Sequence, residues 1–164
     1  MRVDALGHGH SPRFTAEQLL RPFDAMVEKA AEVLRWAAGQ GGSSPTKIIL
    51  CGHSMGGAIA ARLAAQHPEL VRAVILEDPA LLTDQQAEQY RAGAADLVSR
   101  QQRIAADPGT AIRQLQDSHP GWPAEEYQAW AEAKSQVDLD FLNTGIVGSP
   151  TAPSYTNSPS PPCY

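Results

Sequence analysis

Residues 47–65 read KIILCGHSMGGAIAARLAA, and this stretch decides the fold of the chain. The apolar residues 48–51 lead through a glycine-rich turn into an alanine-rich segment, so the pattern predicts a strand, a tight turn and a helix. The unbroken apolar run is typical of a parallel strand that is covered on both faces. Ser54 lies at the centre of the turn. We expect Gly52 and Gly56 to be required there, because a Cβ at either position would collide with neighbouring backbone.

The sequence of this turn, G-x-S-x-G, favours nucleophilic chemistry at Ser54. A sharp turn from strand to helix exposes the serine hydroxyl at the carboxyl end of the strand. The helix that begins at Met55 directs unpaired N–H groups to the same place, so we expect the Met55 N–H to stabilise an oxyanion on a bound acyl carbon. We interpret the stretch as a nucleophile elbow with the turn residues Gly52, His53, Gly56 and Gly57. The alternative is a serine in an ordinary turn, which would not need so many glycines.

Two further stretches indicate the same kind of fold. Residues 4–12 read DALGHGHSP, and residues 71–79 read VRAVILEDP. Together with the GHSMGG turn they resemble the α/β-hydrolase superfamily, whose members carry a D-x-x-G-H-G-x-S turn before the helix that leads to the nucleophile strand. Residues 119–142 are similar to cap helices of the capped serine hydrolase branch. The resemblance covers residues 1–143.

This resemblance implies an α/β fold, namely a partial α/β-hydrolase in which a fragment of parallel sheet with two to three strands is flanked by helices. Residues 1–80 would form the partial core with the elbow, and residues 81–143 a helical cap segment. We expect the proline- and serine-rich residues 144–164 to be a disordered tail. Both ends of the family pattern are missing, so we expect a truncated chain whose tail is an out-of-frame or retained-intron translation.

The patterns also predict individual elements. A strand stub is expected at residues 2–6. Thr15 and Gln18 have the spacing of a capping box, and apolar residues at three- and four-residue steps predict a long helix that begins near Phe23. Because the family places a further strand beside the nucleophile strand, we expect residues 48–50 to form an unpaired edge. After the second strand, three helices are predicted at residues 83–103, 109–117 and 123–137.

The composition excludes several classes of partner and cofactor. A formal net charge of −5 argues against binding to nucleic acid or to an anionic membrane. No stretch reaches the roughly 18 consecutive apolar residues that a membrane-spanning helix needs, so we expect no membrane span. No apolar targeting segment follows the start, so we expect a cytoplasmic protein. The expected partner is a small-molecule substrate. Cys51 and Cys163 form neither a disulfide framework nor a metal-ligand spacing, so we expect no zinc site and no cofactor.

A serine nucleophile needs a base and a carboxylate that orients the base. In the family both follow strands that this sequence lacks. Asp78 is the candidate acid, because some α/β-hydrolases take the acid from the end of this strand. The alternative for Asp78 is an exposed carboxylate that caps the turn at Pro79. Asp4 is expected to anchor the turn of residues 7–11.

None of the histidines is expected to act as the base. His53 precedes Ser54 on the turn, which should direct the two side chains apart. The remaining histidines are interpreted as structural: His8 and His10 in a turn, His67 at a helix end and His119 in a loop.

Two hypotheses follow for the function. In the first, the chain is a serine hydrolase that cleaves a small apolar ester, lactone, thioester or C–C bond, because a serine nucleophile excludes epoxide opening and halide displacement. In the second, it is a truncated fragment or interaction protein without catalysis, because the base is missing. We favour the first for the family and the second for this chain alone.

Three aromatic residues of the expected cap could form part of a substrate site. They either pack a helix face or wall an apolar pocket, and packing is favoured: Trp122, Tyr127 and Trp130.

Overall fold

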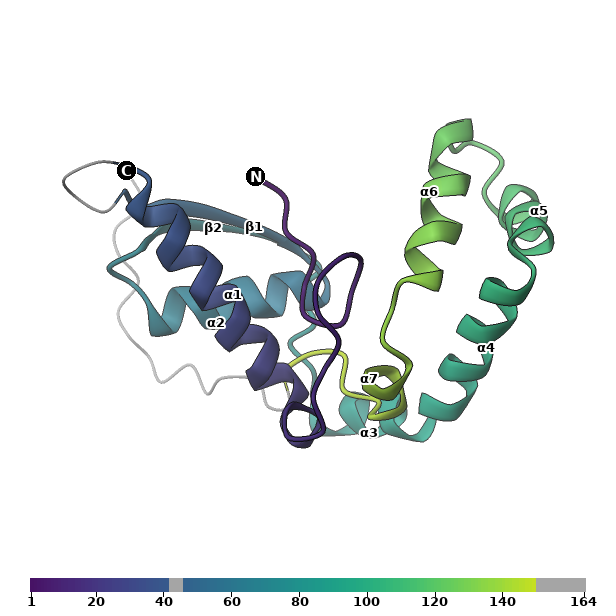
Figure 1. The fold of residues 1–164 in the computed structure, drawn as a ribbon, viewed down its shortest axis with the longest axis horizontal. Helices are drawn as coiled ribbons and strands as arrows, with labels where there is room; N and C mark the ends of the chain where they lie inside the picture. The colour runs from purple at the N-terminus through teal and green to yellow at the C-terminus, as the bar shows by residue number, and fades with distance from the viewer. Residues whose placement is uncertain (42–45, 150–164) are drawn as a thin grey trace.

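The computed structural model describes residues 1–41 and 46–149, and Figure 1 shows a two-stranded sheet at one end and a group of helices at the other. The strands are β1 (Ile48–His53) and β2 (Val71–Glu77). The helical elements are the 3₁₀ turn η1 (Gln18–Leu20), α1 (Pro22–Gly39), α2 (Met55–Gln66), α3 (Asp84–Ala92), α4 (Ala94–Ala106), α5 (Pro108–Ser118), α6 (Ala124–Ser135) and α7 (Leu139–Asn143). None of the described helices is both long and apolar enough to cross a membrane.

The two strands run parallel, with Ile49 beside Ala73 and His53 beside Glu77. Helix α2 connects the strands and packs against both of them, which is the arrangement that a βαβ order favours. Helix α1 packs on α2. The predicted α/β fold class is therefore confirmed. The core is built mainly from these two helices and includes the buried residues Phe23, Met26, Leu34, Ala58 and Leu63.

The sheet is covered on one face, not two. Ile49 is 55% exposed and Ile75 is 58% exposed, whereas Ile48 and Leu50 pack against the core. The prediction that β1 is covered on both faces is wrong for the described residues. The reason is that α2 packs on one face and α1 packs on α2, so that no described element covers the other face. The outer edge of β1 also has no strand beside it among the described residues, as predicted.

The N-terminal segment contains one confirmed and one incorrect prediction. The Thr15 N–H donates to Gln18 Oε1 at 2.9 Å and the Gln18 N–H donates to Thr15 Oγ1 at 3.3 Å, so the reciprocal bonds of the predicted capping box are present just before η1. Helix α1 follows with Pro22 at its first position. Residues 2–6 form no strand. Their polar groups bond within the following turn instead, where the Ser11 hydroxyl donates to the Asp4 carbonyl at 2.7 Å.

Of the three helices predicted after β2, the second and third are confirmed as α5 and α6, whereas the first is not a single helix. The first predicted helix is divided at Gly93, which ends α3 and precedes α4. Asp107 begins α5 by accepting a hydrogen bond from the Thr110 N–H at 3.0 Å. Helix α4 packs on α6 and on the additional short helix α7. The buried side chain of Gln101 donates to the Lys134 carbonyl at 2.9 Å and joins α4 to α6.

After α7 the chain returns to the strands. Ser149 is 2% exposed, forms a parallel bridge with Leu81 and donates its N–H to the Ala80 carbonyl at 3.2 Å. Arg62 on α2 donates to the Ser149 hydroxyl at 3.3 Å. The described part of the predicted tail, residues 144–149, is thus packed on the core. The prediction missed this because it rested on a composition dominated by the prolines beyond residue 149, and residues 150–164 lie outside the described residues.

Candidate active site

Ser54 lies where β1 ends and α2 begins. Its φ of 50° and ψ of −118° place a non-glycine residue at positive φ, a type of strain that costs about 1–3 kcal/mol. Three backbone hydrogen bonds hold this conformation. The Ser54 N–H donates to the Glu77 carbonyl at 2.9 Å, and the Ser54 carbonyl accepts from the Ala80 N–H at 2.9 Å and from the Ala58 N–H at 3.1 Å. Ser54 is also the N-cap residue of α2, but its side chain makes no capping bond. The serine hydroxyl is therefore not used to stabilise the helix.

Met55, the first residue of α2, adds a hydrogen-bond donor beside Ser54. Its N–H has no partner within the helix, as is general for the first N–H groups of an α-helix. The positive end of the helix dipole lies at the same place. Both features stabilise negative charge next to Ser54, so the turn can accommodate a developing oxyanion.

Of the three glycines predicted for the turn, Gly52 and Gly57 are required by close packing and Gly56 is not. A Cβ on Gly52 would collide with the backbone carbonyl of Gly56 and would lie 2.7 Å from the Gly57 nitrogen. A Cβ on Gly57 would lie 2.9 Å from the Pro79 Cβ and 3.0 Å from the Gly52 oxygen. A Cβ on Gly56 would meet no described atom within 4 Å. The expectation for Gly56 is thus wrong, because this residue is exposed in the first turn of α2.

Asp78 lies close to Ser54 in the sheet, because the register of the strands places His53 beside Glu77. It has a φ of 41° and is exposed. Two of the three backbone bonds that hold Ser54 come from the residues on either side of the Asp78–Pro79 turn. Within the described residues, neither the Ser54 hydroxyl nor the Asp78 carboxylate makes a hydrogen bond. The fold therefore brings the two residues to neighbouring strand ends without joining their side chains.

All five histidines lie among the described residues, and none is hydrogen-bonded to the Ser54 hydroxyl. His10 and His53 are exposed. His67 ends α2, with its ring 3.5 Å from a glutamate carboxylate. His119 ends α5, and its Nδ1 lies 2.9 Å from the neighbouring serine hydroxyl.

Asp4 anchors the turn of residues 7–11, as predicted. Its carboxylate accepts a hydrogen bond from the His10 N–H at 3.1 Å. Gly9 has a φ of 53°, and a Cβ there would collide with the Asp4 carboxylate. His8 donates from Nδ1 to a backbone carbonyl two residues earlier, at 3.0 Å. His8 is thus a turn-stabilising residue, which confirms its structural interpretation.

A buried acid that the sequence patterns did not reveal joins this turn to the helices. Asp138 is 7% exposed, accepts from the Phe14 N–H at 2.9 Å and donates its own N–H to the Gly7 carbonyl at 2.7 Å. Arg13 donates to the carbonyls of Gly7 at 3.1 Å and Gln136 at 2.7 Å. The Phe14–Asp138 pair is 124 residues apart in sequence, so no local spacing predicts it. The available signal is an aspartate just before a short helix, which is typical of an N-cap.

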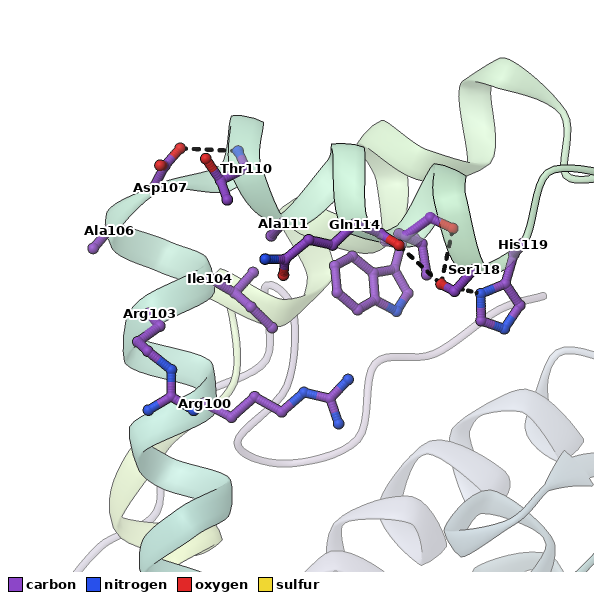
Figure 2. A pocket seen from close by; sticks show the side chains of 12 residues that line it. Arg100, Arg103, Ile104, Ala106, Asp107, Thr110, Ala111, Gln114, Ser118 and His119 are labelled. Atoms are coloured by element: carbon purple, nitrogen blue, oxygen red, sulfur yellow. Dashed lines mark hydrogen bonds between the residues drawn. The ribbon is translucent and has the colours of Figure 1, made fainter.

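A hollow of about 630 Å³ lies between α4, α5 and α6, and Ser54 does not line it (Figure 2). Of the three aromatic residues considered above, Trp130 lines this hollow. Tyr127 is buried and donates to the His119 carbonyl at 2.7 Å, whereas Trp122 is 40% exposed. The packing interpretation is therefore confirmed for Tyr127 but not for Trp130. No cluster of His, Cys, Asp or Glu side chains that could hold a metal ion occurs in the described part of the chain.

Comparison with known proteins decides the family. The model of the family described as serine aminopeptidase, S33, matches residues 1–124. The chain belongs to this family. S33 membership places it in the α/β-hydrolase superfamily, as the resemblance of its motifs implied.

Two curated relatives of this S33 chain are matched over part of their length. The lipase LipV of Mycobacterium tuberculosis is 41% identical over 81 residues, which are 49% of this chain and 27% of that protein. A putative esterase/lipase of Haemophilus influenzae is 37% identical over 78 residues, which are 48% of this chain and 24% of that protein. The chain thus spans about a quarter of the length of these relatives. No solved structure matches it significantly.

Proposed function

We propose that Ser54 is the nucleophile of an esterase- or lipase-type hydrolase. The observation that carries the proposal is the strained backbone of Ser54, at φ 50°, held between β1 and α2 while its hydroxyl makes no capping bond. Strain of this kind persists where the surrounding structure determines it, and it is frequent at functional sites. The N–H of Met55 at the start of α2 supplies one donor for the oxyanion.

The proposed reaction is acyl transfer through Ser54. Its Oγ attacks the acyl carbon while a base takes the hydroxyl proton, the leaving group departs with a proton from that base, and water then hydrolyses the acyl-enzyme. Asp78 is proposed as the carboxylate that orients the base, because it lies at the neighbouring strand end and its carboxylate is uncommitted within the described residues. The names of the two relatives, a lipase and an esterase, support an ester as the substrate. Lactones, thioesters and C–C bonds of small apolar molecules remain within the same proposal.

For residues 1–164 by themselves we propose a non-catalytic state. The supporting observation is the position of the histidines, since none of the five is hydrogen-bonded to the Ser54 hydroxyl. General base catalysis typically contributes about 10²–10⁴-fold to the rate, so its loss removes most of the activity. An added base should restore part of it.

The test uses a fluorophosphonate probe and an activated acetate ester with the full chain. Ser54→Ala is the nucleophile variant, and Ser99→Ala, which changes an exposed serine on α4, is the matched control. Without added base we expect no labelling above the Ser54→Ala level. With imidazole in the buffer we expect acetylation of Ser54, detected by peptide mass spectrometry, in the parent chain and in Ser99→Ala.

Each outcome has a distinct meaning. Ser54-dependent labelling without imidazole would overturn the non-catalytic proposal, because the chain would then contain its own base. If the peptide that contains Ser54 is no more acetylated in the parent chain than the same peptide in Ser54→Ala, the nucleophile proposal is overturned, because the added base would then have found no activated serine.

A further inference from the structure

The hollow between α4, α5 and α6 is partly open to solvent and has both apolar and charged walls. Its volume of about 630 Å³ lies within the range of roughly 300–1,000 Å³ that ligand pockets occupy. Ile104 and Leu115, both buried, and the half-buried Trp130 provide apolar surface. Figure 1 shows these three helices at the opposite end of the molecule from the two strands, so this hollow is separate from the turn that carries Ser54.

Two exposed arginines give the hollow a positively charged wall. Arg100 and Arg103 both line it, and their spacing of three residues places them on the same face of α4. Figure 2 shows Arg100 extended across the hollow, while Gln114 reaches in from α5. Among the described residues no carboxylate pairs with Arg100 or Arg103. Other arginines of the chain, at positions 21, 62 and 91, do pair with acids.

The neighbouring acid offsets only part of the charge of this pair. Of the described residues that line the hollow, one is acidic, Asp107, and its carboxylate accepts the Thr110 N–H at 3.0 Å at the start of α5. Lys134 lies on α6, with its Nζ 5.7 Å from the centre of the Trp130 ring. Burial lowers the pKa of Lys134, and the nearby charge of Arg100 lowers it further, so both cations lie in the same positive field.

We propose that this hollow binds a small amphipathic carboxylate. The planar guanidinium groups of Arg100 and Arg103 match the geometry of a carboxylate. An uncharged hydrocarbon chain of moderate length on the same ligand would lie on the apolar wall. A ligand with a carboxylate and a hydrocarbon chain would contact both the arginines and the apolar wall, whereas a neutral or a fully polar molecule would contact only one of them. The site is separate from the proposed hydrolase chemistry, since none of the residues that line it belongs to the strands or to α2.

The test is a titration of the full chain with octanoate, followed in amide and indole NMR spectra. Octanol is the neutral ligand of the same chain length, and acetate is the carboxylate without the apolar body. We expect octanoate to shift resonances of α4, α5 and α6 and of the Trp130 indole in a saturable way. Because exposed charge pairs contribute little individually, we expect octanol to bind at least about fivefold more weakly.

The variant Arg100→Gln/Arg103→Gln tests the arginines, and Arg35→Gln/Arg72→Gln is the control. The control removes the same charge from exposed positions on α1 and β2, outside the hollow. We expect the first double variant to lose at least about fivefold in octanoate affinity, and the control to be unchanged. The proposal is overturned if octanol binds as tightly as octanoate, if the shifts lie outside these helices, or if the two double variants behave alike. All arms are repeated with Ser54→Ala, so that failure of the nucleophile proposal leaves the result intact.

Discussion

Gly52, Gly56 and Gly57 lie in the Ser54 turn, and we expect replacement by alanine to stabilise the fold at one of them and to destabilise it at the other two. Each is replaced by alanine, which adds one methyl group. At Gly52 the new Cβ would collide with the Gly56 carbonyl and lie 2.7 Å from the Gly57 nitrogen. At Gly57 it would lie 2.9 Å from the Pro79 Cβ, and at Gly56 it would meet no described atom within 4 Å.

These distances set the expected magnitudes. Gly56→Ala should raise the free energy of unfolding by about 0.5 kcal/mol, because alanine orders a helix at lower entropic cost than glycine. Gly57→Ala should lower it by about 1–2 kcal/mol, since the close contact with Pro79 exceeds the gain in helix propensity. Gly52→Ala should lower it by more than about 3 kcal/mol, because rigid backbone on both sides of the methyl group cannot yield. For a domain of marginal stability, the last change is expected to prevent cooperative folding.

Urea denaturation of the full chain, followed by circular dichroism, measures all three variants. Gly39→Ala, near the end of α1, serves as the control, because a Cβ there also meets no described atom within 4 Å. The reasoning is refuted if Gly56→Ala is as unstable as Gly52→Ala. That result would mean that the close approach of the chain at this turn lies at the position first expected from the sequence.

Two further predictions concern acids outside the Ser54 turn. Asp138→Ala should lower the free energy of unfolding by about 3 kcal/mol, because it removes the buried acceptor of three backbone N–H groups. The control Asp140→Ala, at an exposed position, should change the free energy of unfolding by less than about 0.5 kcal/mol, and urea denaturation measures both variants. Hydrogen bonds from Thr110 hold the pKa of Asp107 below its ordinary value of 3.8, so its contribution to the stability of α5 is present above that pH and is lost as the pH falls through the folded-state pKa. The Thr110 amide resonance should report this loss in acid, and Asp107→Asn should remove the pH dependence while it keeps the cap; an unchanged acid titration in that variant would contradict the assignment.

The parts of the fold that were predictable from the sequence are those determined by neighbouring residues. The capping box of Thr15 and Gln18, the long helix α1 and the strand–turn–helix around Ser54 each depend on spacings of a few residues. The hydrogen bonds of Asp138 and the packing of Ser149 join segments far apart in the chain, so local patterns could not reveal them. The exposure of one sheet face was missed for the same reason, since an apolar run does not say what covers it.

The geometry of the turn does not depend on a catalytic base, because the interactions that hold it are local. The pairing of β1 with β2 places the Glu77 carbonyl and the Ala80 N–H on the main chain of Ser54. The close approach at Gly52 brings the start of α2 against the end of β1. The hydrogen bonds of Ser54 and the close approach at Gly52 thus come from residues 48–80, whereas the position of a base depends on contacts that these residues do not make. It follows that changes at Gly52 should first be read as changes in folding, and that only variants that leave the turn intact, such as Ser54→Ala, can test the chemistry.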